Sequence, residues 1–228
     1  MSMSSTSLQP AQSASRIGLL GGSFDPPHLA HLALAHVAQQ QLDLDELRWL
    51  PAGAPWQKAG REMASAEHRL AMLRLLLADQ PGMHIDPREL QRDGATYTVD
   101  TLRELRTERP DAQWFLLLGQ DQYQRLDTWR DWPELLRGLN LAVVARDGQA
   151  PRAPLALAQV AHQMQVLTMA RLDISASQIR QRCARGLSVT ALVGAAVAGY
   201  IEKNGLYAAE NRSAAPANTP DLTGPNRH

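Results

Sequence analysis

Short apolar runs alternate with longer segments of helical periodicity along most of this chain. The runs at 116–118 (LLL) and 141–144 (LAVV) are continuously apolar, which is typical of strands covered on both faces. Strands are expected at 16–20, 47–51, 83–86, 114–118, 140–145 and 165–169. Helices are expected at 29–41, 65–78, 99–109, 133–138, 175–185 and 189–204. This alternation predicts an α/β fold, a parallel sheet with helices on both faces.

The two ends of the chain differ from this pattern. Residues 1–15 are rich in Ser and Gln, and 208–228 are rich in Ala, Pro, Asn and Thr, so both are expected to be disordered tails. The segment between them, 16–207, is long enough to form one domain with a sizeable core. Within it, 145–158 is rich in Pro, Gly and Arg and is expected to be the longest internal loop.

The segments that follow the strands locate the expected site. In open parallel sheets, ligands bind beyond the carboxyl ends of the strands, where the connections reverse direction. Polar and glycine-rich segments follow each of the first four expected strands, at 21–31, 51–58, 88–98 and 119–121. These segments therefore converge on one edge of the sheet, as a substrate cleft requires.

The first of these segments, 21–31 (GGSFDPPHLAH), is the most specific feature of the chain. A strand, a glycine turn and a helix start together form an anion site, because the first backbone N–H groups of a helix lack internal partners and carry partial positive charge. His28 and His31 lie on one side of that first turn. Nearby phosphates would favour the charged form of such a histidine.

Other interpretations of 21–31 are weaker. The glycines alone fit a plain turn, and the histidines fit a surface pair. A zinc-protease helix requires His-Glu-x-x-His, and a dinucleotide fingerprint requires Gly-x-Gly-x-x-Gly, and neither pattern is present in this segment. No metal site formed by protein side chains is expected. Phosphate chemistry is the favoured interpretation.

Three later segments carry weaker signals. In 174–180 (ISASQIR), Ser175 is a candidate N-cap and Arg180 lies about one and a half turns beyond it, which suits a triphosphate but also an ordinary capped helix. In 94–102 (GATYTVDTL), Thr98 is the expected helix cap. In 119–121 (GQD), the aspartate is placed to hold a ribose hydroxyl, and the nearby Trp129 is either a core residue or a face for an aromatic ring.

Composition limits the classes of partner. The 228 residues include 23 Lys plus Arg and 23 Asp plus Glu, so there is no basic excess of the kind that binds nucleic acid or an anionic membrane. No segment is apolar and long enough to span a bilayer, and 1–15 lacks the apolar region of a secretory signal. The single cysteine, Cys183, excludes an internal disulfide and fits a reducing cytoplasm.

The motifs together resemble a known family. Segment 21–31 is similar to the phosphate loop of the nucleotidyltransferase superfamily with a His-x-Gly-His-type motif, and 174–180 is similar to that superfamily's Ile-Ser-x-Thr-x-Ile-Arg signature. Residues 97–102, 119–121 with Trp129, and 200–207 resemble the bacterial nicotinate-mononucleotide adenylyltransferases. The resemblance covers 16–207 and implies a Rossmann-like, doubly wound nucleotidyltransferase domain.

The resemblance also implies a reaction and roles for residues. ATP and nicotinate mononucleotide would give deamido-NAD and pyrophosphate in NAD biosynthesis, with Mg²⁺ bound to the ATP phosphates. The catalytic residues would be His28, His31 and Arg180. The ATP site would comprise Gly21, Gly22, Ser23, Phe24, His28, His31, Ile174, Ser175, Ser177 and Arg180. The mononucleotide site would comprise Lys58, Thr98, Gly119, Asp121, Trp129 and Arg130, with the Trp129 ring on the pyridine and Asp121 near ribose.

Three positions depart from the family pattern. Ala30 replaces the glycine of His-x-Gly-His, and Ser177 replaces the threonine of the second signature and keeps its hydroxyl. Where some members have His-Arg, this chain has Gln57 and Lys58, so Lys58 is the expected ligand of the mononucleotide phosphate. The oligomeric state is left open, with a homodimer among the options.

The sequence leaves three alternative functions open. A phosphopantetheine adenylyltransferase shares the phosphate loop, but 97–102 and Trp129 favour the mononucleotide enzyme. A tRNA-charging enzyme has a similar histidine site but needs more chain and basic charge than are present here. A nucleotide sensor without activity is disfavoured by the presence of both histidines and Arg180, and turnover would decide the matter.

Overall fold

The computed structural model describes residues 14–53, 63–145 and 150–209. The expected tails, 1–15 and 208–228, lie almost entirely outside the described residues. Lys58, the expected phosphate ligand, also lies outside them.

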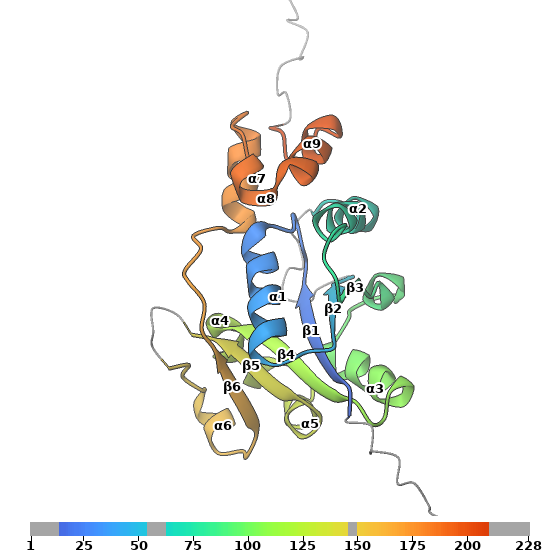
Figure 1. Cartoon of the computed structure of the whole chain (residues 1–228), viewed down its shortest axis with the longest axis vertical. Coiled ribbons are helices and arrows are strands. Elements are labelled where there is room, and N and C mark those ends of the chain that lie inside the picture. The colour runs from blue at the N-terminus through green and yellow to red at the C-terminus, as the bar shows by residue number, and fades with distance from the viewer. Residues whose placement is uncertain (1–13, 54–62, 146–149, 210–228) are drawn as a thin grey trace, which may run out of the picture.

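The described residues contain a six-stranded sheet in which every strand pair is parallel. Its order is β3-β2-β1-β4-β5-β6 (Figure 1). The strands are β1 (Arg16–Gly22), β2 (Glu46–Pro51), β3 (Met83–Ile85), β4 (Gln113–Gly119), β5 (Asn140–Val144) and β6 (Gln163–Leu167). Six expected strands are therefore confirmed with small shifts at their ends, and the order is that of a doubly wound, Rossmann-like sheet.

Helices cover both faces of this sheet and form two hydrophobic cores. The helices are α1 (Leu29–Gln41), α2 (Ala66–Leu76), α3 (Thr98–Glu108), α4 (Gln120–Tyr123), α5 (Trp132–Gly138), α6 (Leu155–Ala158), α7 (Ala176–Ala184), α8 (Thr190–Val193) and α9 (Ala195–Lys203). Residues of α1, α2 and α7 to α9 form one core with the sheet, and residues of α3 to α6 form the other. Figure 1 shows α7, α8 and α9 gathered beyond the N-terminal end of α1.

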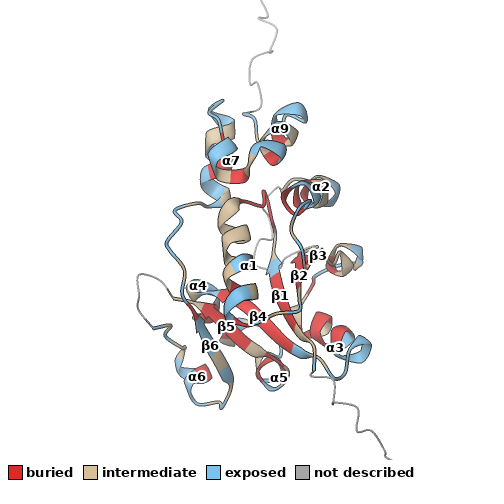
Figure 2. Ribbon diagram, viewed as in Figure 1, coloured by how far each residue is buried: buried red, intermediate tan, exposed pale blue. Residues whose placement is uncertain are grey.

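Alternation along the strands supplies both cores. Neighbouring side chains of a strand point to opposite faces, so Leu20 and Leu117 join the first core while Leu19 and Leu116 join the second. All four are nearly inaccessible to solvent, and Figure 2 shows the central strands as buried. The core thus forms a rigid platform whose carboxyl edge carries the site.

Three local expectations are corrected. The segment 189–204 is not one helix, because Gly194 adopts a left-handed φ of 85° and separates α8 from α9. Thr98 does not cap α3; Tyr97 is the N-cap residue and Thr98 is the first helical residue. The expected loop 145–158 ends in a short helix, α6.

The strand order identifies where a ligand can enter. The chain leaves β1 toward β2 and β3 on one side, and it leaves β4 toward β5 and β6 on the other. A crevice forms at the carboxyl ends of two strands whose connections diverge in this way. None of the helices in the described ranges is long and apolar enough to cross a membrane.

Candidate active site

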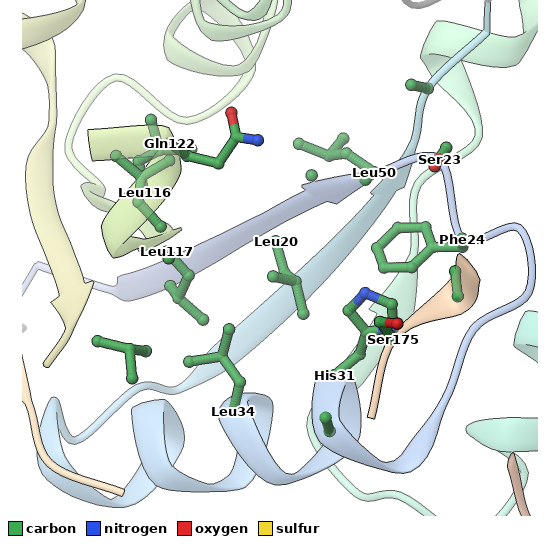
Figure 3. Close-up of a pocket in the computed structure, with 18 of the residues that line it drawn as sticks. Leu20, Ser23, Phe24, His31, Leu34, Leu50, Leu116, Leu117, Gln122 and Ser175 are labelled. Atoms are coloured by element: carbon green, nitrogen blue, oxygen red, sulfur yellow. The ribbon is translucent and has the colours of Figure 1, made fainter. Parts of the chain in front are cut away.

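A cleft of about 980 Å³ opens at the carboxyl ends of β1 and β4. In Figure 3, Leu20 and Leu117 of the sheet point into it, His31 and Ser175 lie together on one side, and Gln122 lies on the other. A Cβ added at Gly21, the last residue but one of β1, or at Gly119, the last residue of β4, would meet no atom within 4 Å. A ligand can therefore approach both strand ends closely enough to contact the backbone.

The stacked rings of His28 and His31 lie at the start of α1. His28 is the N-cap residue, and its carbonyl accepts hydrogen bonds from the N–H groups of His31 (3.0 Å) and Leu32 (3.3 Å). The N–H of His28 donates to Nδ1 of His31 at 3.3 Å. In the neutral ring, Nε2 of His31 therefore carries the proton. The ring centroids are 3.6 Å apart with an 18° angle between planes, as helical spacing of three residues allows.

His28 is deeply buried. Only 6% of the residue is exposed, and its Nδ1 has no hydrogen-bond partner within the described parts of the chain. Burial lowers the pKa of His28 to about 4, so the ring is neutral at physiological pH. The charged form expected from the sequence thus requires the phosphates to be present.

Arg69 fixes the loop that precedes these histidines. The side chain of Arg69 is almost completely buried on α2. Its Nη1 donates to the carbonyls of Ser23 and Ala52, each at 2.8 Å, and its Nε donates to the carbonyl of Ala64 at 3.2 Å. Three separate segments are therefore tied to one guanidinium, which holds the glycine turn in place. Arg69 was not among the site residues expected from the sequence, because nothing in its local pattern indicates these distant partners.

The start of α7 closes the same end of the cleft. Ser175 is the N-cap, as expected, and its Oγ accepts from the N–H of Gln178 at 3.2 Å. Ile174 and Ser175 line the cleft, whereas Ser177 and Arg180 lie outside its lining. Nη1 of Arg180 donates to the carbonyl of Asp25 at 2.6 Å, and Nη2 donates to Oγ of Ser177 at 3.0 Å. In this structure Arg180 is bound to the loop itself.

Most of the residues expected at the mononucleotide end also meet in the cleft. Thr98, Gly119, Trp129 and Arg130 line it, and the exposed Asp121 does not. The guanidinium carbon of Arg130 lies 4.7 Å from the centroid of the Tyr97 ring, a cation–π contact. At this end the described residues thus provide aromatic faces with a cation beside them.

At the ATP end, the remaining expected residues are also brought together. Gly22, Ser23 and Phe24 line the cleft with Ala30, whose methyl group stands where the family has glycine. The rings of Phe24 and His31 pack in a T-shaped arrangement, with centroids 5.1 Å apart and planes at 77°.

Glu89 is a cleft residue that was not expected from its sequence context. It is 8% exposed, and its Oε1 accepts from Oγ1 of Thr101 at 2.7 Å. Burial raises the pKa of this carboxyl, with the hydrogen bond from Thr101 opposing the shift. Its burial comes from tertiary packing, so its sequence context carried no signal beyond its place after the third strand.

Comparisons with known proteins agree with this geometry. A family model described as cytidylyltransferase-like matches residues 19–182. A probable nicotinate-nucleotide adenylyltransferase of Methylibium petroleiphilum is 47% identical over 197 residues, covering 85% of this chain and 92% of that protein. A relative of the same name from Bordetella pertussis is 48% identical over 196 residues, covering 84% and 98%.

A solved structure has the same fold. The Plasmodium falciparum nicotinic acid mononucleotide adenylyltransferase complexed with NaAD superposes with a TM-score of 0.70 at 17% identity, covering 85% of this chain and 97% of that one.

Proposed function

This chain belongs to the cytidylyltransferase-like family and, within it, to the nicotinate-nucleotide adenylyltransferases, and we propose that its cleft is the site of adenylyl transfer. The enzyme transfers the adenylyl group of ATP to nicotinate mononucleotide, giving deamido-NAD and pyrophosphate in NAD biosynthesis. The observation that carries the assignment of the site is the stacked pair, His28 and His31, at the start of α1, with the start of α7 beside it in one cleft.

The reaction needs positioning rather than a strong base. A phosphate oxygen of nicotinate mononucleotide, already ionised at neutral pH, attacks the α-phosphorus of ATP. The bond from that phosphorus to the β-phosphate oxygen breaks, and pyrophosphate leaves with the electron pair. The histidine pair and the backbone donors of Gly21, Gly22 and Ser23 would bind oxygens that gain charge in the transition state. In the neutral His31 ring, the N–H at Nε2 can donate a hydrogen bond to such an oxygen.

Arg180 would serve the β- and γ-phosphates together with the start of α7. Its present hydrogen bonds, to the carbonyl of Asp25 and to Ser177, hold the guanidinium next to the phosphate loop. The role therefore needs a shift of the side chain when ATP arrives. Oxygens of the phosphates would be stronger partners than a neutral carbonyl, because both groups are charged.

Mg²⁺ is proposed to enter with ATP as part of the substrate. The histidine nitrogens and backbone donors at this end of the cleft suit phosphate oxygens better than they suit Mg²⁺, which prefers oxygen ligands and keeps several waters. The ion would therefore be held by ATP and water, and would neutralise charge on the phosphates.

The mononucleotide would occupy the other end of the cleft. Trp129 would stack on the pyridine ring, and Thr98 and the backbone near Arg130 would meet the nicotinate carboxylate. Asp121, which lies outside the lining, and Lys58, which lies outside the described residues, remain predictions. The cytoplasmic location and the possible homodimer also remain predictions.

The test is pyrophosphate release from ATP and Mg²⁺ with a panel of acceptors. Nicotinate mononucleotide should give the highest kcat/KM, nicotinamide mononucleotide a lower value, and phosphopantetheine none. Release with phosphopantetheine alone would favour the alternative transferase. Release with no acceptor in the panel would contradict the proposal and favour a nucleotide sensor.

A further inference from the structure

The carboxylate of Asp25 joins the far end of the chain to the phosphate loop. Asp25 lines the cleft, yet only 1% of it is exposed. Its Oδ1 accepts hydrogen bonds from the Tyr207 hydroxyl at 2.7 Å and from the N–H of Ala64 at 3.2 Å. Its Oδ2 lies 3.9 Å from Nη1 of Arg180. The segment after α9 is therefore bonded directly to the loop at the ATP end of the cleft.

Tyr207 reaches Asp25 because the chain turns back after α9. The N–H of Gly205 donates to the carbonyl of Glu202 at 3.1 Å, and the N–H of Leu206 donates to the carbonyl of Ile201 at 3.0 Å. Gly205 and Tyr207 have left-handed φ values of 60° and 61°. A tyrosine in this region is strained, so its contacts must hold it there.

The Tyr207 hydroxyl is a permanent hydrogen-bond donor at this point. Burial, followed by the hydrogen bond to Asp25, raises the pKa of Tyr207 well above its ordinary value. The hydroxyl therefore keeps its proton at neutral pH.

Tyr207 and Arg180 approach the same carboxylate. The 3.9 Å separation of Nη1 of Arg180 from Oδ2 is too long for a hydrogen bond, and Nη1 donates to the Asp25 carbonyl instead. Opposite charges attract strongly at a buried site, because the effective dielectric constant is lower there than in water. A buried carboxylate that loses a donor is costly to leave under-bonded, so a nearby cation can replace that donor. The Arg180 guanidinium is such a cation, 3.9 Å from Oδ2 of Asp25.

We propose that Tyr207 is a positioning residue for ATP, whose hydrogen bond to Asp25 keeps that carboxylate from drawing Arg180 away from the β- and γ-phosphates. The inference rests on the proposed function, in which Arg180 serves ATP. Without the hydroxyl, ATP must compete with Asp25 for the guanidinium. Nicotinate mononucleotide binds at the other end of the cleft and meets no such competition.

The test variant is Tyr207→Phe, which removes one oxygen and retains the ring. The matched control is Tyr200→Phe on α9, which loses a hydrogen bond of similar kind, 2.9 Å from the hydroxyl to Nδ1 of His68 on α2. Both variants remove a tyrosine hydroxyl from the C-terminal part of the domain, and only the first removes one from the phosphate loop. Thermal unfolding of each variant records any general loss of stability.

Kinetics and calorimetry then separate the two substrates. Tyr207→Phe should raise the KM of ATP and the Kd of a non-hydrolysable ATP analogue by about two- to tenfold, the scale of one hydrogen bond. The KM of nicotinate mononucleotide should not change, and Tyr200→Phe should change neither constant. In the Arg180→Ala background, Tyr207→Phe should have no further effect on the analogue, because no guanidinium is left to be drawn away.

A rescue variant covers the case in which Tyr207→Phe alone folds poorly. Adding Asp25→Asn removes the charge that attracts Arg180, so the double variant should bind the ATP analogue as tightly as Asp25→Asn does on its own.

Three results would overturn the inference: equal losses for both substrates, equal losses in both tyrosine variants, or an effect that persists in the Arg180→Ala background. Failure of the wild type to turn over ATP and nicotinate mononucleotide would contradict the proposed function instead. Analogue binding would still report on Tyr207 in that case.

Discussion

Binding of ATP should be accompanied by uptake of a proton at His28. Burial lowers the pKa of His28 to about 4, so protonating it at pH 7 spans about three pKa units and costs about 4 kcal/mol. One negative charge 4 Å away returns about 4 kcal/mol at an effective dielectric constant of about 20. A triphosphate brings more than one charge, even with Mg²⁺ bound. The balance therefore favours the charged ring once ATP is in place.

Calorimetry measures this uptake directly. The heat of ATP binding at pH 7 is recorded at fixed Mg²⁺ in two buffers with different ionisation enthalpies, and the difference gives the number of protons taken up. The wild type should take up close to one proton more than His28→Gln, whose amide retains hydrogen-bonding capacity without the charge. Above pH 7 the wild-type affinity should fall by up to about tenfold per pH unit. Equal proton uptake by the two proteins would refute the reasoning.

The other predictions concern stability and each end of the cleft. Folding lowers the pKa of His28 from 6.5 to about 4, so between these two pH values the unfolded chain binds more protons than the folded one. The contribution of neutral His28 to the free energy of unfolding is therefore complete above pH 6.5 and is lost as the pH falls toward 4. From pH 7 to pH 5, the free energy of unfolding measured in urea should fall by roughly 2 kcal/mol less in His28→Gln than in the wild type. Equal falls in the two proteins would contradict this. Arg180→Ala should weaken ATP binding by about tenfold or more and leave the Kd of nicotinate mononucleotide unchanged in calorimetry; the reverse pattern would exclude its proposed role. The wild type should prefer nicotinate to nicotinamide mononucleotide by about ten- to several-hundred-fold in kcat/KM, because N–H donors placed for a carboxylate would face the donors of the amide. Trp129→Ala should weaken both acceptors through lost stacking without reversing that preference, and equal wild-type values for acid and amide would show that no such pocket exists.

The sheet was predictable because its signals are local. Continuous apolar runs such as 116–118 mark strands buried on both faces, and their alternation with helical patterns implies parallel pairing. The break in 189–204 was not predictable, because alanines and valines on both sides of Gly194 fit a continuous helix. A glycine inside such a segment costs only about 1 kcal/mol, so the sequence did not distinguish a helical glycine from a left-handed one.

The candidate site was predictable where its residues are neighbours in the sequence. The position of His28 and His31 at the start of α1 follows from one short segment, and helical spacing brings their rings together. The same holds for Ser175 at the start of α7. Glu89 was missed because its burial depends on packing against α3 rather than on its own segment.

The contacts that hold the phosphate loop are of the opposite kind. Asp25 meets Arg180 across 155 residues and Tyr207 across 182, and no local pattern indicates such pairs. Their consequence is functional as well as structural. If Tyr207 keeps Asp25 from drawing Arg180 away, the two signature motifs do not by themselves form an ATP site. The turn that follows α9 then belongs to that site, because it brings Tyr207 to the loop.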